Sequence, residues 1–496
     1  MMKNDDDESP FISINKAKTG LGRREENTRT LEMAALRGVQ LKDCTIRPLL
    51  LLLSRKYASR PALVTEGRQE STKQNLPSPE LKVSRMSNGT VIAALENHSP
   101  VASLSAVVAA GSRHEDLSLL GSTHCLRASA FLTNRRTSMF KIQRCIDMVG
   151  GNLEITSTRE YTMYSMNALR DHIHDLANIL GGILTKPLYY PWELHDIRQR
   201  MRLEKSIAMH STHMAVLEDL HMIAYKNALR NSLYCPDFMM EKFTQDMMMD
   251  FIHNHITSSR LAVVGIGMSH DAVQAAAERH FKITEGSGRP IDKVKYIGGE
   301  HRVHTDSKLV HTLLVAESSS VVGPQAGAFA VLQHVLGAGP YTKRGLNSGS
   351  KLSPALNKAS RFPSVAMAFN ASYSDSGLFG IYSICPSEAV SDVIGAGLAE
   401  IKAIADGKLT EDEVNRARMQ VRARLLMSAE EQKSVLHELG SQALFTGKFV
   451  APTEAAESLN SIVAANVVDA AKKVFAGKKT MVSHGDLSHT PFLDEL

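Results

Sequence analysis

Short apolar runs alternate with longer segments of helical periodicity along most of the chain. The first two runs, Leu81–Met86 and Val91–Leu95, flank Asn88-Gly89, the dipeptide most typical of a β-hairpin turn. A third run, Leu104–Ala110, is followed by a segment with helical spacing at Ser118–Phe131. Because strands and helices are mixed in this way, the pattern predicts an α+β fold.

The order of predicted elements repeats in the second half of the chain, which indicates an internal duplication. The first half continues with the helix Met139–Val149, the hairpin strands Leu153–Ser157 and Tyr161–Ala168, the helices Ile173–Leu184 and Trp192–Met209, the strand Leu261–Ile266 and the helix Asp271–His280. The second half contains the strand Val310–Ala316, the helix Gln325–Leu336, the hairpin strands Val365–Ser372 and Gly377–Ile384, the helices Glu388–Ala405 and Glu411–Met427, and the strand Thr480–Ser483.

A chain of 496 residues is too long for one ordinary hydrophobic core, so at least two domains are expected. We expect an N-terminal domain at residues 81–284 and a C-terminal domain at residues 301–496. The Gly-, Pro- and Lys-rich segment 285–300 is the predicted linker between them. Each domain should form a mostly antiparallel sheet covered by helices on one face.

The segment before residue 81 differs in composition from the rest of the chain. Residues 1–32 are polar and acidic, which indicates a disordered extension. Residues 33–60 contain six basic residues and one acidic residue around a leucine block, a composition typical of a mitochondrial transit peptide. A chance basic helix is the alternative for this segment. We expect translation to begin at Met33 or the extension to be a variant start, the mature chain to begin soon after residues 55–60, and residues 61–80 to form a linker.

Charge and cysteine content narrow the range of functions. The net charge of +5 is too small and too dispersed to indicate nucleic-acid binding. The five cysteines include no C-x-x-C pair, which argues against a structural zinc or disulfide framework and favours a reducing compartment. No apolar run approaches the length of a membrane span. No haem or iron–sulfur motif occurs, so we expect no bound cofactor.

The helical segment after the third strand carries the candidate chemistry. His124, Arg127 and Ala128 stand at i, i+3 and i+4 and therefore share one helix face. In zinc peptidases of the H-x-x-E-H type, these positions hold a histidine, a glutamate and a second histidine. Alanine cannot bind a metal, and arginine stays protonated, so it can neither bind zinc nor accept a proton from water. Glu204 is the candidate for a third ligand on a later helix.

The simpler interpretation is that His124 is a hydrogen-bonded helix histidine and Glu204 a solvated helix residue. We therefore expect no catalytic, metal-binding or cofactor-binding residue, and we treat His124, Arg127, Ala128 and Glu204 as positions of a degenerate motif. The glycine-rich segment Leu336–Ser350 lacks the order of a phosphate-binding loop and is predicted to be a flexible loop at a cleft or an interface.

Two segments of this region carry a family resemblance. GSRHED (residues 111–116) and GSTHCLRASAF (residues 121–131) stand where the mitochondrial processing peptidase group carries its G-S-R and H-x-x-E-H segments. LGAGPYTKRG stands where the non-catalytic partner in that group carries its glycine-rich loop. From about Leu81 to Leu496, the chain resembles the pitrilysin-like (M16) peptidase family. The resemblance is closest to the core-subunit branch of the mitochondrial cytochrome b-c1 complex, through stretches such as LENHSPVASL, NSLYCPDF, FNASYSDSGLFGIYSI and HTPFLDEL.

This resemblance implies a non-catalytic structural subunit of respiratory complex III, peripheral to the mitochondrial inner membrane on the matrix side. The implied partners are core protein 1, cytochrome b, cytochrome c1, the Rieske iron–sulfur protein and small subunits, in a dimeric complex that passes electrons from ubiquinol to cytochrome c. The resemblance leaves open an alternative, the substrate-binding half of a presequence-processing peptidase formed with core protein 1. A generic matrix binding protein is the remaining possibility.

Overall fold

A computed structural model describes residues 77–339 and 350–496 of the chain, and all structural statements below concern these residues. The predicted extension, the predicted transit peptide and residues 61–76 of the predicted linker lie outside the described residues. Residues 340–349, which form most of the glycine-rich loop, also lie outside them.

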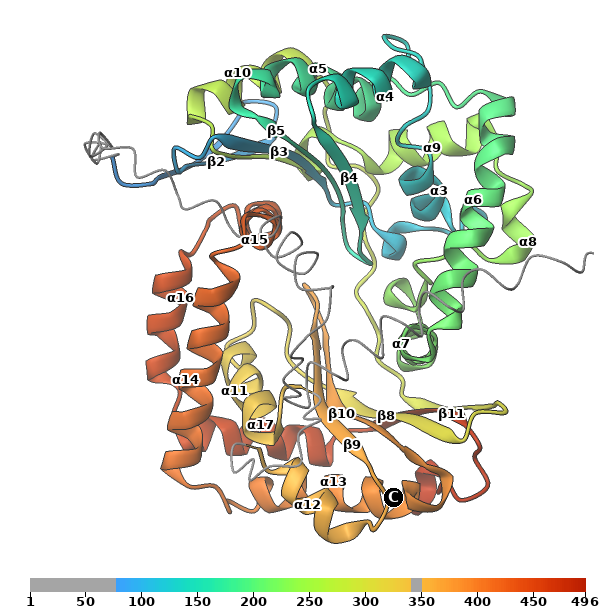
Figure 1. The fold of residues 1–496 in the computed structure, drawn as a ribbon, viewed down its shortest axis with the longest axis vertical. Coiled ribbons are helices and arrows are strands. Elements are labelled where there is room, and N and C mark those ends of the chain that lie inside the picture. Colours follow the sequence, from blue (N-terminus) through green and yellow to red (C-terminus); the bar gives the residue numbers. More distant parts are fainter. Residues whose placement is uncertain (1–76, 340–349) are drawn as a thin grey trace, which may run out of the picture. The chain divides into compact units, whose positions relative to one another are not determined.

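The first half of the described chain forms a six-stranded sheet in the order β1-β2-β6-β3-β5-β4. Its strands are β1 (Glu80–Arg85), β2 (Val91–Glu96), β3 (Val101–Val108), β4 (Asn152–Ser157), β5 (Thr162–Leu169) and β6 (Leu261–Ile266). Only the pairing of β2 with β6 is parallel. Helices α5 (Ile173–Thr185) and α10 (His270–His280) cover one face and share its core (Figure 1). Every residue of β6 is buried, as expected for a central strand covered on both faces.

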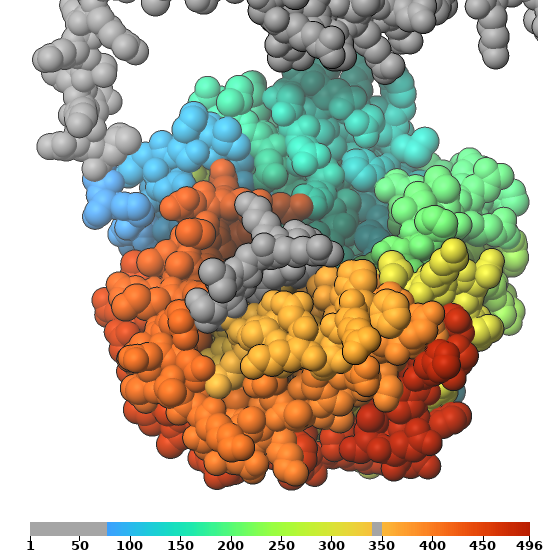
Figure 2. Space-filling view, turned by 60° about the horizontal axis from the view of Figure 1, so that its bottom comes forward, coloured from blue at the N-terminus to red at the C-terminus, as the bar shows by residue number. Residues whose placement is uncertain are grey.

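The second half forms a five-stranded sheet in the order β7-β11-β8-β10-β9. Its strands are β7 (Gly299–His304), β8 (Leu309–Glu317), β9 (Val365–Ser372), β10 (Gly377–Pro386) and β11 (Lys479–Gly485), and only β7 and β11 pair in parallel. Helices α11 (Ala326–Leu336), α13 (Val390–Ala405) and α17 (Ala464–Ala476) cover one face. The C-terminal segment, red in Figure 2, lies next to β7, in yellow, because Arg302 donates hydrogen bonds to three of its carbonyl oxygens.

The remaining helices connect and flank the two sheets. They are α3 (Ser122–Ala128), α4 (Met139–Met148), α6 (Pro191–His210), α7 (Thr212–Ala224), α8 (Asp237–Met240), α9 (Gln245–His255), α12 (Leu352–Ala359), α14 (Glu411–Ser428), α15 (Gln432–Thr446) and α16 (Pro452–Ser458). A T-x-x-E capping box, with reciprocal hydrogen bonds between Thr410 and Glu413, begins α14. No helix in the described residues is both long enough and apolar enough to cross a membrane.

The two halves exchange one helix each. Helix α15, from the second half, packs on β2, β3 and β6 of the first sheet through Leu436, Leu439 and Ala443, which share one helix face (Figure 1). Gly440 permits this close approach, because a Cβ there would lie 2.9 Å from Val107 Cγ2. In return, α7 packs on β7, β8 and β11 of the second sheet through Val216, Leu220 and Ala224.

The structure confirms the predicted α+β fold and most of the predicted elements. Two differences have clear physical reasons. The predicted helix at 118–131 shortens to α3, because Gly121 precedes it in the left-handed conformation (φ 85°). Strand β7, GEHRVH, was not predicted because it is mostly polar. Each sheet carries its own half's helices on one face, as expected, and in addition the exchanged helix on the other.

The exchanged helix gives a test of this packing. Leu439→Ala removes a fully buried side chain between α15 and the first sheet, so the free energy of unfolding should fall by about 2–5 kcal/mol. Met427→Ala, at an exposed position near the end of α14, is the matched control and should change it by less than about 0.5 kcal/mol. Denaturant titration of both purified variants makes the comparison. Equal effects would mean that α15 does not contribute to the core of the first sheet.

Candidate functional site

Helix α3 is anchored at its first turn by a buried carboxylate. Glu115 accepts hydrogen bonds from the Gly121 N–H (2.7 Å) and from the N–H and hydroxyl of Thr123 (2.8 and 2.6 Å). Burial raises the pKa of Glu115 to about 7, against the effect of these hydrogen bonds. Residue 121 must be glycine, because a Cβ there would lie 2.6 Å from Cys235 Cβ. These contacts fix the direction in which α3 presents its side chains.

The structure places His124 in a fully buried position with both ring nitrogens in use. Its Nδ1 accepts a hydrogen bond from the Cys235 N–H (3.1 Å), so the proton lies on Nε2, which faces Glu204 Oε2 at 3.3 Å. Burial, followed by the nearby charge of Arg127, lowers the pKa of His124 to about 4, although Glu204 acts in the opposite direction. His124 is therefore a neutral, hydrogen-bonded histidine near pH 7.

Arg127 approaches the same carboxylate oxygen as His124. Its Nη2 lies 3.5 Å from Glu204 Oε2, its Nη1 donates to the Ser157 hydroxyl (2.5 Å), and its guanidinium lies over the Tyr234 ring. Arg200 donates to the other oxygen of Glu204 at 2.9 Å. Burial alone would raise the pKa of Glu204, but the hydrogen bond from Arg200 and the charges of Arg127 and Arg200 hold it below its usual value. Glu204 is thus an ionised carboxylate shared by two arginines and a histidine.

The structure therefore brings together three of the four positions of the degenerate motif, His124, Arg127 and Glu204. The fourth, Ala128, is buried in the core of the first half. Within residues 77–339 and 350–496, no three histidine, cysteine or acidic side chains are grouped so that they could hold a metal ion.

Comparison of the sequence with known proteins identifies the family of this chain. The profile described as "Insulinase (Peptidase family M16)" matches residues 91–237, and "Peptidase M16 inactive domain" matches residues 242–421. A protein of Rattus norvegicus named "Cytochrome b-c1 complex subunit 2, mitochondrial" is 44% identical over 421 residues, which cover 85% of this chain and 93% of that protein. The chain belongs to the M16 peptidase family.

Two further relatives, which carry different names, also match most of the chain. A Homo sapiens protein, also named "Cytochrome b-c1 complex subunit 2, mitochondrial", is 44% identical over the same shares of the two chains. The Arabidopsis thaliana "Probable mitochondrial-processing peptidase subunit alpha-2, chloroplastic/mitochondrial" is 27% identical, over 84% of this chain and 85% of its own. The similarity is thus higher to the named complex subunits than to the named peptidase subunit.

The zinc ion of an M16 peptidase does not fit the residues of this site. A catalytic zinc needs three protein ligands and a free position for water. On the α3 face, only His124 is a ligand type, and its Nδ1 already accepts a backbone hydrogen bond. The cationic group of Arg127 lies beside Glu204, so it would repel a dication at the same place. We therefore derive no zinc-dependent step for this chain.

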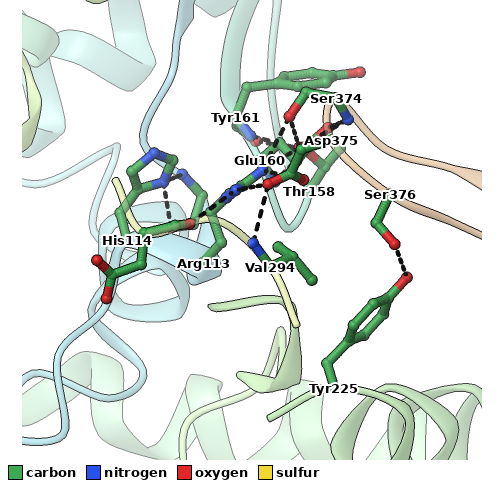
Figure 3. Close-up of polar contacts among 12 residues, drawn as sticks. Arg113, His114, Thr158, Glu160, Tyr161, Tyr225, Val294, Ser374, Asp375 and Ser376 are labelled. Atoms are coloured by element: carbon green, nitrogen blue, oxygen red, sulfur yellow. Dashed lines mark hydrogen bonds and ion pairs between the residues drawn. The ribbon is translucent and has the colours of Figure 1, made fainter. Parts of the chain in front are cut away.

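A second arrangement, which the sequence analysis missed, joins the two halves of the M16 fold (Figure 3). The buried guanidinium of Arg113 pairs with Glu160 (2.5 Å) in the first half and with Asp375 (2.9 Å) in the second. The N–H and hydroxyl of Ser374 donate to Glu160 at 3.1 and 2.6 Å, and the Val294 N–H donates to Asp375 at 3.2 Å. Glu160, Ser374 and Asp375 lie in turns that were predicted only as connections, and Arg113 lies in the GSRHED segment, for which only the family resemblance was noted.

Helix α7 is tied to both halves by buried polar contacts of the same kind. Arg159, in the turn between β4 and β5, pairs with Glu218 of α7 at 2.8 Å, and both side chains are buried. His221 of α7 has its Nδ1 2.7 Å from the Leu217 carbonyl oxygen and its Nε2 2.5 Å from the Tyr373 hydroxyl of the second half. Burial, with the charge of Arg159, lowers the pKa of His221 to about 3. The ion pair to Arg159 and the hydrogen bond to Tyr373 thus hold α7 between the two halves.

The buried histidines predict how stability depends on pH. The folded pKa of His124, about 4, lies below the value of about 6.5 expected in the unfolded chain. Between these values the unfolded chain binds more protons, so the free energy of unfolding should fall as the pH is lowered from 6.5 towards 4. His221 acts in the same direction, whereas Glu115, with a raised pKa, acts in the opposite direction between pH 7 and 4.5.

His124→Gln should therefore make this fall with decreasing pH less steep. The matched control is His174→Gln, at an exposed position on α5, which should leave the slope as it is in the parent chain. Denaturant unfolding at several pH values between 7 and 4 measures the slopes. Identical slopes for the parent and His124→Gln would contradict a buried, neutral His124.

Proposed function

We propose that this chain is a non-catalytic structural subunit of mitochondrial respiratory complex III, in the place of the subunit 2 for which its relatives are named. The observation that carries the proposal is the 44% identity to "Cytochrome b-c1 complex subunit 2, mitochondrial", which extends over 93% of that protein. A relative from the fungus Cryptococcus neoformans with the same name is 29% identical over 93% of its length. Because the similarity extends over nearly the full length of these relatives, it supports a shared role as well as a shared fold.

The proposal includes a location and a set of partners. The chain would lie on the matrix side of the inner membrane, pair with core protein 1, and support cytochrome b, cytochrome c1 and the Rieske iron–sulfur protein within a dimeric complex. Electrons from ubiquinol to cytochrome c would pass through those redox subunits. The basic segment at residues 33–60 would act as the transit peptide that brings the chain to the mitochondrion.

The absence of peptidase activity is part of the proposal and is supported by the α3 face. Peptide hydrolysis in this family needs a metal-bound water and a group that accepts its proton. Arg127, where a glutamate would be needed, is a permanent cation, and Ala128 has no donor atom. Arg127 also lies 3.5 Å from Glu204, so a positive charge already occupies the place beside this carboxylate.

The buried contacts between the halves support a scaffold role. Arg113 and Glu160 are buried, whereas Asp375 is partly exposed, and loss of Glu160 would leave the Arg113 charge in the interior with only Asp375 as a partner. The exchanged helices α7 and α15 add apolar contacts across the same boundary. A chain built in this way would present fixed surfaces to its neighbours, which is what a structural subunit requires.

A second candidate is the substrate-binding half of a presequence-processing peptidase formed with core protein 1. The similarity to the Arabidopsis "Probable mitochondrial-processing peptidase subunit alpha-2" favours it, since 27% identity extends over 85% of that protein. In this case the partner would supply the metal site, and purified chain with core protein 1 would cleave presequence peptides in a chelator-sensitive way.

Extraction of mitochondrial membranes with a mild detergent tests the main proposal. The tagged chain should migrate on a native gel at the mass of complex III, together with cytochrome b and cytochrome c1. A variant lacking residues 33–60 is the control and should remain outside the mitochondrion. Recovery of the full chain as a soluble matrix monomer would overturn the proposal. Cleavage of presequence peptides by a separate pair with core protein 1 would favour the second candidate.

A further inference from the structure

A groove of about 950 Å³ lies in the first half, and none of its lining residues belongs to α3. It is lined by residues of α4, α5, α10 and the turn before α4. Figure 1 shows these three helices side by side over the first sheet. The lining residues of α4 include Lys141, Cys145 and Met148, which share one helix face by their spacing of four and three. We call this the α4–α5–α10 groove.

The cations of the α4–α5–α10 groove have no acidic partner among the residues that the structure describes. Arg136, Lys141 and Arg279 line it, and none of them takes part in the ion pairs found among residues 77–339 and 350–496. The guanidinium of Arg136 donates to the side-chain oxygen of Asn178, which is uncharged, at 2.7 Å. The one carboxylate in the lining is Asp175, so the groove carries an excess of positive charge. Unpaired cations that line a concave surface indicate a negatively charged ligand.

The apolar part of the lining includes an exposed side chain of α4. Met148, Val149 and Ile179 contribute apolar surface inside the groove. Met148 is 74% exposed. Large apolar side chains exposed next to a groove are typical of surfaces that a partner covers. The groove therefore combines an apolar strip with unpaired cations.

We propose that the α4–α5–α10 groove binds an acidic amphipathic helix of a partner protein. Such a helix would place its apolar stripe against Met148 and Ile179 and its carboxylates beside Arg136 and Arg279. The lining also contains Thr137, His174 and Asn178, polar side chains that suit a peptide better than a lipid acyl chain. This proposal rests on the proposed function in one respect, because the partner is expected to be a component of complex III.

Site-specific photo-cross-linking in the assembled complex tests this proposal. Benzoylphenylalanine replaces Met148, at the edge of the groove, and the cross-linked peptides are identified by mass spectrometry. The expected product is a cross-link to one segment rich in Asp and Glu, with apolar residues at helical spacing. The control probe replaces Phe362, an exposed apolar residue of the second half, and should not capture that segment.

Charge reversal provides the second measurement. Arg279→Glu should lower the yield of the Met148 cross-link about tenfold, because like charges would then face each other. Arg422→Glu, an equal charge change at an exposed position of α14, should leave the yield unchanged. Changing an acidic residue of the captured segment to lysine should restore the yield with Arg279→Glu.

Each outcome decides the proposal. A cross-link to lipid alone, a captured segment without acidic residues, or no cross-link in a chain that does assemble into complex III would overturn it. A chain that does not assemble into complex III at all would instead overturn the proposed function, so the two failures can be told apart by the native gel.

Discussion

Apolar packing of one helix from each half against the sheet of the other half holds this fold together. Each sheet has one face covered by helices of its own half, and the other face would be exposed without α15 or α7. Burial of these faces is the main favourable contribution to the free energy of folding at the boundary. The buried Arg113 then fixes how the halves are oriented, since a charged group in the interior needs its partners, here Glu160 and the partly exposed Asp375, at fixed positions. Fold and scaffold role thus have the same physical origin.

The M16 fold of this chain is held together without the zinc-binding residues of the H-x-x-E-H motif. The α3 helix is held by Glu115, Gly121 and Cys235, none of which needs a metal ion. At the former metal face, Arg127 supplies a positive charge beside Glu204, so the carboxylate keeps a partner of opposite charge. The contacts that position α3 and those that surround Glu204 therefore involve only side chains and backbone of the chain itself.

The sequence predicted those features that depend on local periodicity. Strand β6 and helix α5 were predicted because their apolar residues follow the spacing of buried elements, and α14 because of its capping box. The degenerate motif was also visible, since His124, Arg127 and Ala128 are close in sequence. Its partner Glu204 could be named because it lies on a strongly charged helix at a family position, and the structure shows it 3.3 Å from His124.

The features that were missed depend on long-range contacts. An apolar face on α15 or α7 indicates burial but does not state which sheet it covers, because apolar contacts have no direction. Arg113 and Asp375 are far apart in sequence, and each stands in a polar turn where a solvated side chain is the usual expectation. The mostly polar strand β7 forms because β11 offers it a parallel neighbour, which no local pattern reveals.

Zinc content shows whether the α3 face of this chain can hold a metal ion. The unmodified chain and the double variant Arg127→Glu/Ala128→His are purified, equilibrated with zinc and dialysed, and circular dichroism confirms that both are folded. We expect no stoichiometric zinc in the unmodified chain. In the double variant, where the cation is removed and His124 and Glu204 gain a second imidazole, we expect about one zinc per chain. Tight, stoichiometric zinc in the unmodified chain would mean that the α3 face is a metal site after all.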